Sequence, residues 1–135
     1  MKKIRILLVD DHALIRAGIR NSLINHEHLE IVAEATNGNE AITHLAETTF
    51  DLVIMDLSMP EMSGTEATRI IREEYPDVNV LILSMHNEEA RIREALTAGA
   101  MGYILKSTAM SELLEAIETV SNGQPYFTRE VSTKI

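Results

Sequence analysis

The chain has 135 residues, of which 45% are apolar and none is cysteine, and its formal net charge is −9 at pH 7. This length supplies one hydrophobic core and therefore one domain, no apolar run approaches the roughly 20 residues of a membrane-spanning helix, and disulfides are excluded. Nine acidic residues and no Lys or Arg lie between positions 21 and 68, so direct contact with a nucleic-acid backbone is not expected.

Apolar runs that predict strands alternate along the chain with amphipathic stretches that predict helices. The expected strands are 4–9, 30–35, 52–55, 78–83 and 101–105, and the expected helices are 12–25, 38–48, 64–74, 87–98 and 110–122. This strict alternation predicts an α/β fold with a doubly wound, five-stranded parallel sheet between two helical layers, as in flavodoxin. We assign residues 1–123 to this domain and 124–135 to a C-terminal tail or the start of a linker.

Polar side chains follow four of the predicted strands, at the edge where such sheets bind ligands. Asp10 and Asp11 follow the first strand, Asp56 the third, Ser84 the fourth and Lys106 the fifth. Clustered carboxylates either raise one another's pKa or share a cation, and oxygen ligands favour Mg²⁺. Each residue also has an ordinary alternative, because Asp11 can cap a helix and Lys106 can be a solvated surface lysine. The combination in this order nevertheless predicts a single site.

With these residues, the sequence resembles the CheY-like receiver domains of two-component response regulators over about residues 4–123. The matching stretches are LLVDDHALIR, DLVIMDLSMPEMSGTEATR, ILSMHNEE and ALTAGAMGYILKS. Within that family, LSMH and the Ser after the lysine are similar to LuxR-type transcriptional regulators of the NarL/FixJ kind. The resemblance implies a cytoplasmic signalling switch, not an enzyme acting on an external substrate, that a sensor histidine kinase phosphorylates.

The resemblance also implies a role for each acidic residue of the site. Asp56 would accept the phosphoryl group, Asp11 would bind the Mg²⁺ cofactor directly, and Asp10 would act largely through water. The backbone carbonyl of Ser58 would complete the protein ligands of the metal.

The same resemblance implies how phosphorylation reaches the surface. Ser84 and Lys106 would bind the phosphoryl oxygens, and Tyr103 would change position together with Ser84. The expected output is a homodimer, formed through the first and last helices or through the surface near Tyr103. DNA would be bound only by a helix-turn-helix domain beyond Ile135, and no membrane partner is expected.

Three positions depart from the commonest receiver pattern. Ser107 stands where many receivers have Pro after the lysine, so a trans peptide is the expectation there. Ser58 and His86 lie two residues beyond Asp56 and Ser84, where side chains flank the path of the hydrolytic water. We expect these two side chains to influence the lifetime of the phosphoryl group.

Two other functions are weighed against the switch. A small phosphatase or flavodoxin-like enzyme would need a pocket with aromatic or Gly-rich walls, and the chain has few aromatic residues. A phosphorylation-independent binding module of receiver type would be expected to lack one of the acids or Lys106, and all are present. The five histidines lack the spacing of a metal site, so none is expected to be a ligand.

Overall fold

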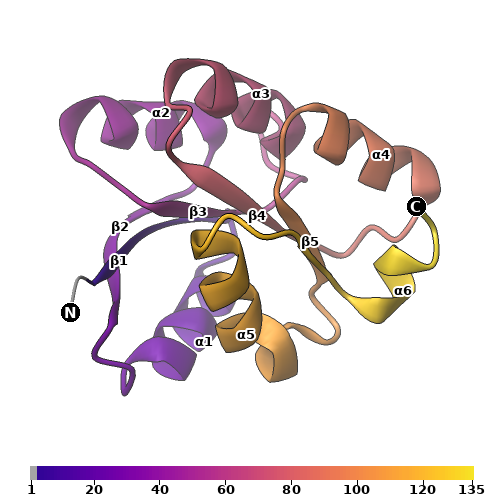
Figure 1. Ribbon diagram of the computed structural model, residues 1–135. Helices are drawn as coiled ribbons and strands as arrows, with labels where there is room; N and C mark the ends of the chain where they lie inside the picture. The colour runs from indigo at the N-terminus through magenta and orange to yellow at the C-terminus, as the bar shows by residue number, and fades with distance from the viewer. Residues whose placement is uncertain (1–2) are drawn as a thin grey trace.

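The computed structural model describes residues 3–135 and has a single sheet of six parallel strands in the order β2-β1-β3-β4-β5-β6 (Figure 1). The strands are β1 (Ile4–Val9), β2 (Leu29–Ala35), β3 (Leu52–Met55), β4 (Asn79–Ser84), β5 (Gly102–Leu105) and β6 (Tyr126–Phe127). The helices are α1 (Ala13–Leu23), α2 (Gly38–Glu47), α3 (Gly64–Glu74), α4 (Glu89–Thr97), α5 (Ala109–Ser121) and α6 (Arg129–Ser132). The predicted α/β fold is confirmed.

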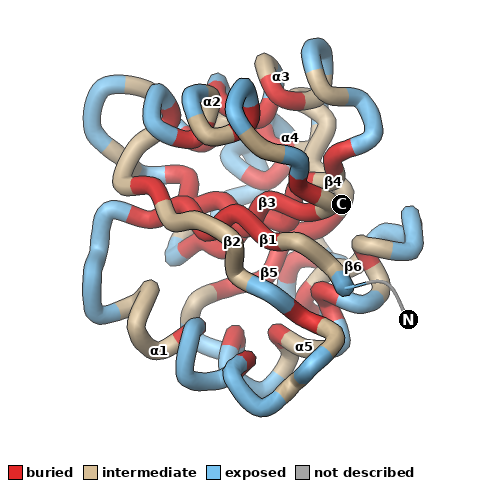
Figure 2. The backbone as a smooth tube through the Cα atoms, turned by 90° about the vertical axis from the view of Figure 1, so that its left-hand side faces the viewer, coloured by how far each residue is buried: buried red, intermediate tan, exposed pale blue. Residues whose placement is uncertain are grey.

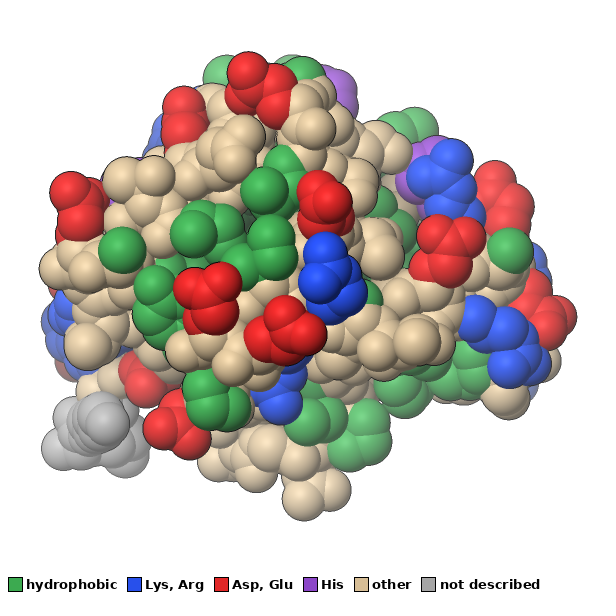
Figure 3. All heavy atoms as spheres, turned by 90° about the horizontal axis from the view of Figure 1, so that it is seen from above, with side chains coloured by type: hydrophobic (Ala, Val, Ile, Leu, Met, Phe, Trp, Pro, Cys, Tyr) green, Lys and Arg blue, Asp and Glu red, His purple; other side chains and the backbone are tan. Residues whose placement is uncertain are grey.

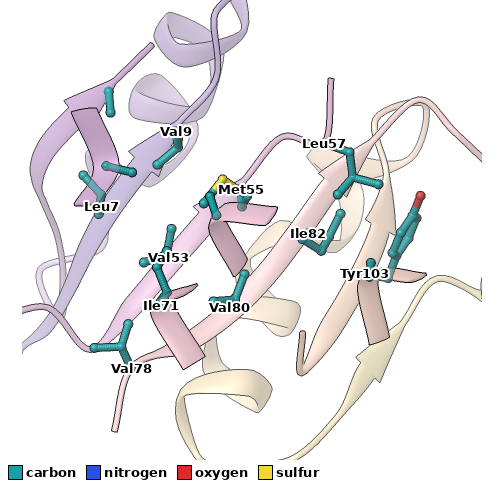
Figure 4. Packing of buried hydrophobic residues seen from close by; sticks show 14 of the residues in the cluster. Leu7, Val9, Val53, Met55, Leu57, Ile71, Val78, Val80, Ile82 and Tyr103 are labelled. Atoms are coloured by element: carbon teal, nitrogen blue, oxygen red, sulfur yellow. The ribbon is translucent and has the colours of Figure 1, made fainter. Parts of the chain in front are cut away.

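Helices cover the sheet on both faces, with α1 and α5 below it and α2, α3 and α4 above it in Figure 1. Successive side chains of a strand point to opposite faces, so each central strand contributes to two hydrophobic clusters. Leu7, Val53 and Val80 pack beneath α2, α3 and α4 (Figure 4), whereas Ile6 and Leu81 pack toward α1 and α5. Figure 2 shows the resulting buried sheet between helices whose outer sides are exposed.

Side chains that cap helices fix where two of the crossovers begin. Asn37 accepts a 2.9 Å hydrogen bond from the Glu40 backbone N–H at the start of α2. Ser63 accepts one of 3.2 Å from the Glu66 N–H at the start of α3. Each bond satisfies an N–H that has no partner within its own helix, so each helix starts at a defined residue.

The segment after α5 contains a strand that the sequence pattern did not predict. Tyr126 and Phe127 form β6, which pairs in parallel with Gly102 and Tyr103 of β5. Val131 of α6 is fully buried in the cluster beneath α2, α3 and α4. A strand of two residues is too short to show an alternating pattern, and its pairing with β5 stabilises it instead.

The outer face of α2, α3 and α4 carries mixed charges. Figure 3 shows acidic and basic side chains interspersed on this face, with a group of apolar side chains among them. Such a mixture differs from the basic stripe with which proteins bind nucleic acids. None of the helices in residues 3–135 is long and apolar enough to cross a membrane.

Candidate functional site

Parallel strands bring the predicted polar residues together at one edge of the sheet. Asp10 follows β1, Asp56 follows β3, Ser84 ends β4, and Lys106 follows β5. The Lys106 Nζ atom lies 3.0 Å from Oδ2 of Asp10 and 3.4 Å from Oδ1 of Asp56. Because backbone hydrogen bonds continue one residue past the strands, from Asp56 to Val9 and from Lys106 to Ser84, the sheet itself sets these positions.

Asp56 is buried, with 3% of its surface exposed, although it carries a carboxyl group. Its Oδ1 accepts a long hydrogen bond of 3.4 Å from the Ser58 N–H, and among the described residues its buried Oδ2 has no hydrogen-bond partner. Burial raises the pKa of Asp56 above its ordinary value, and the neighbouring Asp10 raises it further. The Lys106 ammonium opposes both effects but does not cancel them. A lone buried oxygen of this kind is suited to a cation or an incoming electrophile.

The two acids after β1 differ in their surroundings. Asp10 is buried, and its Oδ1 accepts a 2.9 Å hydrogen bond from the backbone N–H of His12. Asp11 is exposed and does not cap α1, because the N-cap residue is His12 and makes no side-chain capping bond. The alternative structural role that the sequence allowed for Asp11 is therefore not used, and its carboxylate lies in one cluster with Asp10 and Asp56.

His12 is a member of the site that sequence reasoning missed. Its Nδ1 lies 3.0 Å from Oδ1 of Asp10 and 3.1 Å from Oδ1 of Asp11. Ligand atoms of Asp10, Asp11, His12 and Asp56 all lie within 4.8 Å of one another. The spacing between histidines gave no sign of this, and the available signal was that His12 directly follows two acids at a strand end.

These side chains fit a divalent cation. Carboxylate oxygens of Asp10, Asp11 and Asp56 lie close together. Oδ2 of Asp56 has no hydrogen-bond partner within the part of the chain that the structure describes. Such oxygen donors are those that Mg²⁺ prefers. The backbone carbonyl of Ser58 stays a predicted ligand.

The loop between β3 and α3 takes an unusual path beside Asp56. Glu61 has a φ of 68°, and the Met62 N–H donates a 2.8 Å hydrogen bond to the carbonyl of Pro60, which closes a three-residue turn. A Cβ atom on Gly64 would lie 2.0 Å from the Asp56 carbonyl oxygen. Glycine at this position therefore lets α3 start directly against the backbone of the candidate acceptor.

The predicted switch residues meet at the loop after β4. Oγ of Ser84 accepts a 2.9 Å hydrogen bond from the His86 N–H, while the buried Tyr103 donates a 2.7 Å bond to the His86 carbonyl. Burial raises the pKa of Tyr103, against a smaller lowering by its contact with Ser84. Tyr103 thus points inward and supports the loop. Whether it moves with Ser84 stays a prediction.

The two side chains expected to flank the water path contact each other. Oγ of Ser58 and Nε2 of His86 lie 2.7 Å apart, which links the loops after β3 and β4. Sequence alone does not predict this contact, because it depends on the paths of two loops. The expected trans peptide before Ser107 is present, since residues 3–135 contain no cis bond.

The segment 124–135 contacts the loop after β4 and the end of β5. Nδ2 of Asn87 donates a 2.8 Å hydrogen bond to Glu130, and Nζ of Lys134 donates one of 2.7 Å to the carbonyl of Asn87. Oγ1 of Thr128 accepts a 3.2 Å bond from the N–H of Leu105. Hydrogen bonds therefore join this segment to Asn87, in the loop after Ser84, and to Leu105, which precedes Lys106.

Known proteins share both the sequence and the fold of this chain. Residues 6–118 match the family model of the response regulator receiver domain. The transcriptional regulatory protein DegU of Brevibacillus brevis is 38% identical over 130 residues, which are 96% of this chain and 55% of that protein. The response regulator UvrY of Escherichia coli K12 is 39% identical over 132 residues, 98% and 61% of the two chains. This chain therefore spans little more than half the length of these relatives.

Solved structures agree with these relatives. A two-component response regulator of the LuxR family from Aurantimonas sp. SI85-9A1 has a TM-score of 0.93 and 39% identity, covering 99% of this chain and 96% of its own. The isolated REC domain of RcsB from Salmonella enterica serovar Typhimurium, in the presence of phosphomimetic BeF3⁻, has a TM-score of 0.91 and 26% identity, covering 99% of both chains. The similarity therefore extends over nearly the whole chain.

Proposed function

Because this chain belongs to the response regulator receiver family, we propose that it is a phosphorylation-activated switch in which Asp56 accepts a phosphoryl group from a sensor histidine kinase. The observation that carries the proposal is the meeting of Asp56, Asp10 and Lys106 at the carboxyl edge of the sheet. A nucleophile on a packed strand end is held in one position, which favours in-line attack on an incoming phosphorus.

The proposed reaction transfers a phosphoryl group between two protein side chains. A carboxylate oxygen of Asp56 attacks the phosphorus of a phosphohistidine, so that an O–P bond forms while the N–P bond breaks. The histidine nitrogen leaves with the electron pair of that bond, and an acyl phosphate results. The approach of two anions is the main barrier, and the Lys106 ammonium, 3.4 Å from Asp56, is placed to offset the charge of the phosphoryl oxygens.

We assign Mg²⁺ as the cofactor of this site, held by Asp11, Asp56 and the carbonyl of Ser58. When bound, Mg²⁺ supplies positive charge that both the acceptor and the phosphoryl oxygens face. Asp10 would act mainly through water, because His12 and Lys106 already contact its two oxygens. The exposed Asp11 has more of its carboxylate available for direct binding.

The output would begin at Ser84, whose hydroxyl in this structure is bonded to the backbone of His86. A phosphoryl group on Asp56 would attract this hydroxyl, change the loop after β4, and alter the support that Tyr103 gives to it. The adjoining Asn87 is bonded to Glu130 and Lys134, so the change would also reach the segment 124–135.

Phosphorylation would promote a homodimer, and the structure favours one of the two faces considered. Near Tyr103 the edge of β5 is covered by β6 and α6. Apolar side chains remain exposed on the other face, with Leu14 on α1, Ile24 directly after α1 and Met110 on α5. We therefore propose a dimer through α1 and α5. DNA would be bound by a separate helix-turn-helix domain after Ile135, because the relatives include longer transcriptional regulators.

Mass spectrometry after incubation with phosphoramidate and Mg²⁺ tests the proposal. We expect one phosphoryl group on Asp56 in the native chain and none after Asp56→Asn. Asp51→Asn is the matched control, because this carboxylate lies before β3, at the opposite end of the same strand. Modification that persists in full after Asp56→Asn would exclude the assignment, and no modification of the native chain would favour a phosphorylation-independent binding module.

A further inference from the structure

His12 places a nitrogen atom among the carboxylates of the site. Its Nδ1 is 3.0 Å from Asp10 and 3.1 Å from Asp11, and it belongs to the same 4.8 Å cluster as Asp56. The backbone of His12 is fixed at the start of α1, where its carbonyl accepts a 3.1 Å hydrogen bond from the Arg16 N–H. The imidazole therefore extends from an ordered position toward the two acids.

The 3.1 Å between Nδ1 of His12 and Oδ1 of Asp11, the exposed acid assigned to direct binding, matches the distance between neighbouring ligands of one cation. In an octahedral site with metal–ligand bonds of about 2.1 Å, adjacent ligand atoms lie about 3.0 Å apart. The buried Oδ2 of Asp56, which has no partner within residues 3–135, independently indicates that a further charged group belongs in this cluster.

We propose that Nδ1 of His12 is a ligand of the cation in this site and shifts its preference from Mg²⁺ toward later transition-metal ions such as Co²⁺. This inference rests on the proposed function, because it concerns the same cation site. Mg²⁺ gains little from a nitrogen ligand, since it prefers oxygen and retains water, whereas imidazole suits transition metals. The expectation from histidine spacing, that no histidine is a metal ligand, is replaced by this proposal.

The opposing view is that His12 only donates a hydrogen bond to the two acids. In that case the imidazole does not bind the cation, and its loss affects Asp10 and Asp11 in the same way whichever cation is bound. Mg²⁺ and Co²⁺ affinities would then change by the same factor. The ratio of the two affinities therefore separates a ligand from a hydrogen-bond donor.

Isothermal titration of the whole chain with Mg²⁺ and with Co²⁺ tests the proposal. His12→Ala should lower the affinity for Co²⁺ about 10-fold or more, which is the loss that even an indirect partner of a ligand can cause. The affinity for Mg²⁺ should change far less. Equal changes for the two cations, or no change for either, would overturn the proposal.

Two further variants make the result specific to His12. His44→Ala removes an imidazole on α2 and should leave both affinities unaltered; a loss of Co²⁺ binding as large as in His12→Ala would assign the preference to another site. Asp11→Asn should lower the affinity for both cations. If it lowers neither affinity, the proposed cation site is wrong. If it lowers both, but His12→Ala leaves the ratio of the Co²⁺ and Mg²⁺ affinities unchanged, only the inference about His12 is refuted.

Pulsed electron paramagnetic resonance with Mn²⁺ gives a direct readout. A nitrogen bound to Mn²⁺ produces a hyperfine coupling that oxygen ligands cannot give. We expect this coupling in the native chain and in His44→Ala, and its absence in His12→Ala. A native spectrum without nitrogen coupling would contradict direct ligation.

Discussion

Arg16 donates a 2.6 Å hydrogen bond from Nη1 to the backbone carbonyl of Asp10. Its Nε donates a second bond, of 2.9 Å, to the carboxylate of Glu34 on β2. One guanidinium thus connects α1, the loop after β1 and the neighbouring strand. Because Asp10 and Asp11 are adjacent on that loop, Arg16 holds the backbone that carries both acids and does not contact their carboxylates.

Arg16→Ala should therefore weaken Mg²⁺ binding about 10-fold, the lower end of the losses seen when a residue that orients a metal ligand is removed. Titration calorimetry provides the affinity. Arg20→Ala is the matched control, because Arg20 also binds Glu34 but is exposed and, among the described residues, makes no hydrogen bond to Asp10. Equal losses of Mg²⁺ affinity in the two variants would assign the effect to the contact with Glu34 and not to the hydrogen bond between Arg16 and the Asp10 carbonyl.

Asp11→Ala should reduce Mg²⁺ affinity more than Asp10→Ala. The oxygens of Asp10 already contact the His12 N–H and Lys106, whereas the carboxylate of Asp11 is exposed next to the site. Calorimetric titration of both variants compares them directly. A larger loss in Asp10→Ala would make Asp10 the direct ligand, and unchanged affinity in both would place the cation elsewhere.

Asp56→Asn should stabilise the metal-free protein at neutral pH. Burial raises the pKa of Asp56, so the ionised form is less favourable in the folded than in the unfolded chain. The stability that depends on this group is present below the unfolded pKa of about 4 and is lost as pH rises through the folded value. At pH 7 we expect Asp56→Asn to raise the free energy of unfolding, and this gain should shrink toward pH 4.

Urea unfolding of the native chain and of Asp56→Asn, at several pH values in the presence of a chelator, measures this gain. Asp77→Asn is the control for loss of one negative charge, because Asp77 is exposed in the loop before β4. A gain that is independent of pH, or that Asp77→Asn reproduces, would not support a penalty for ionising Asp56.

The sequence predicted the fold and the meeting of the acids with Lys106 for the same physical reason. Parallel strands end at a common edge, so residues that follow strands meet whatever the loops do. The strand bounds 4–9 and 52–55 are confirmed. They were predictable because Asp10 and Asp56 directly follow the two apolar runs. The contacts of His12, and the bond between Ser58 and His86, depend on loop paths and rotamers, which no periodic pattern encodes.

Gly64→Ala should destabilise the fold and disturb Asp56. The new Cβ would lie 2.0 Å from the Asp56 carbonyl oxygen, and a backbone atom cannot move away as a flexible side chain can. We expect a loss of about 3 kcal/mol, at the upper end of overpacking effects. Gly18→Ala is the matched control in α1, where no atom lies within 4 Å, and should stabilise by about 0.5–1 kcal/mol. Thermal unfolding compares the two, and similar effects would contradict the role assigned to Gly64.

Phosphorylation should promote self-association through α1 and α5. Met110 lies where these helices meet, because its sulfur is 3.0 Å from Oγ of Ser22 on α1, and it remains 57% exposed. Sedimentation should show a monomer alone and a dimer with beryllofluoride and Mg²⁺. Met110→Glu would place a charge in this face and should prevent the dimer.

Met85→Glu is the control for that substitution, because Met85 is also an exposed methionine but lies in the loop after β4 and on neither α1 nor α5. It should still dimerise with beryllofluoride. If Met85→Glu prevents the dimer and Met110→Glu does not, the face near Tyr103 is the interface in spite of its covering by β6 and α6.

A gel-shift titration at low salt should detect no DNA binding by residues 1–135, since the net charge of −9 repels the phosphate backbone.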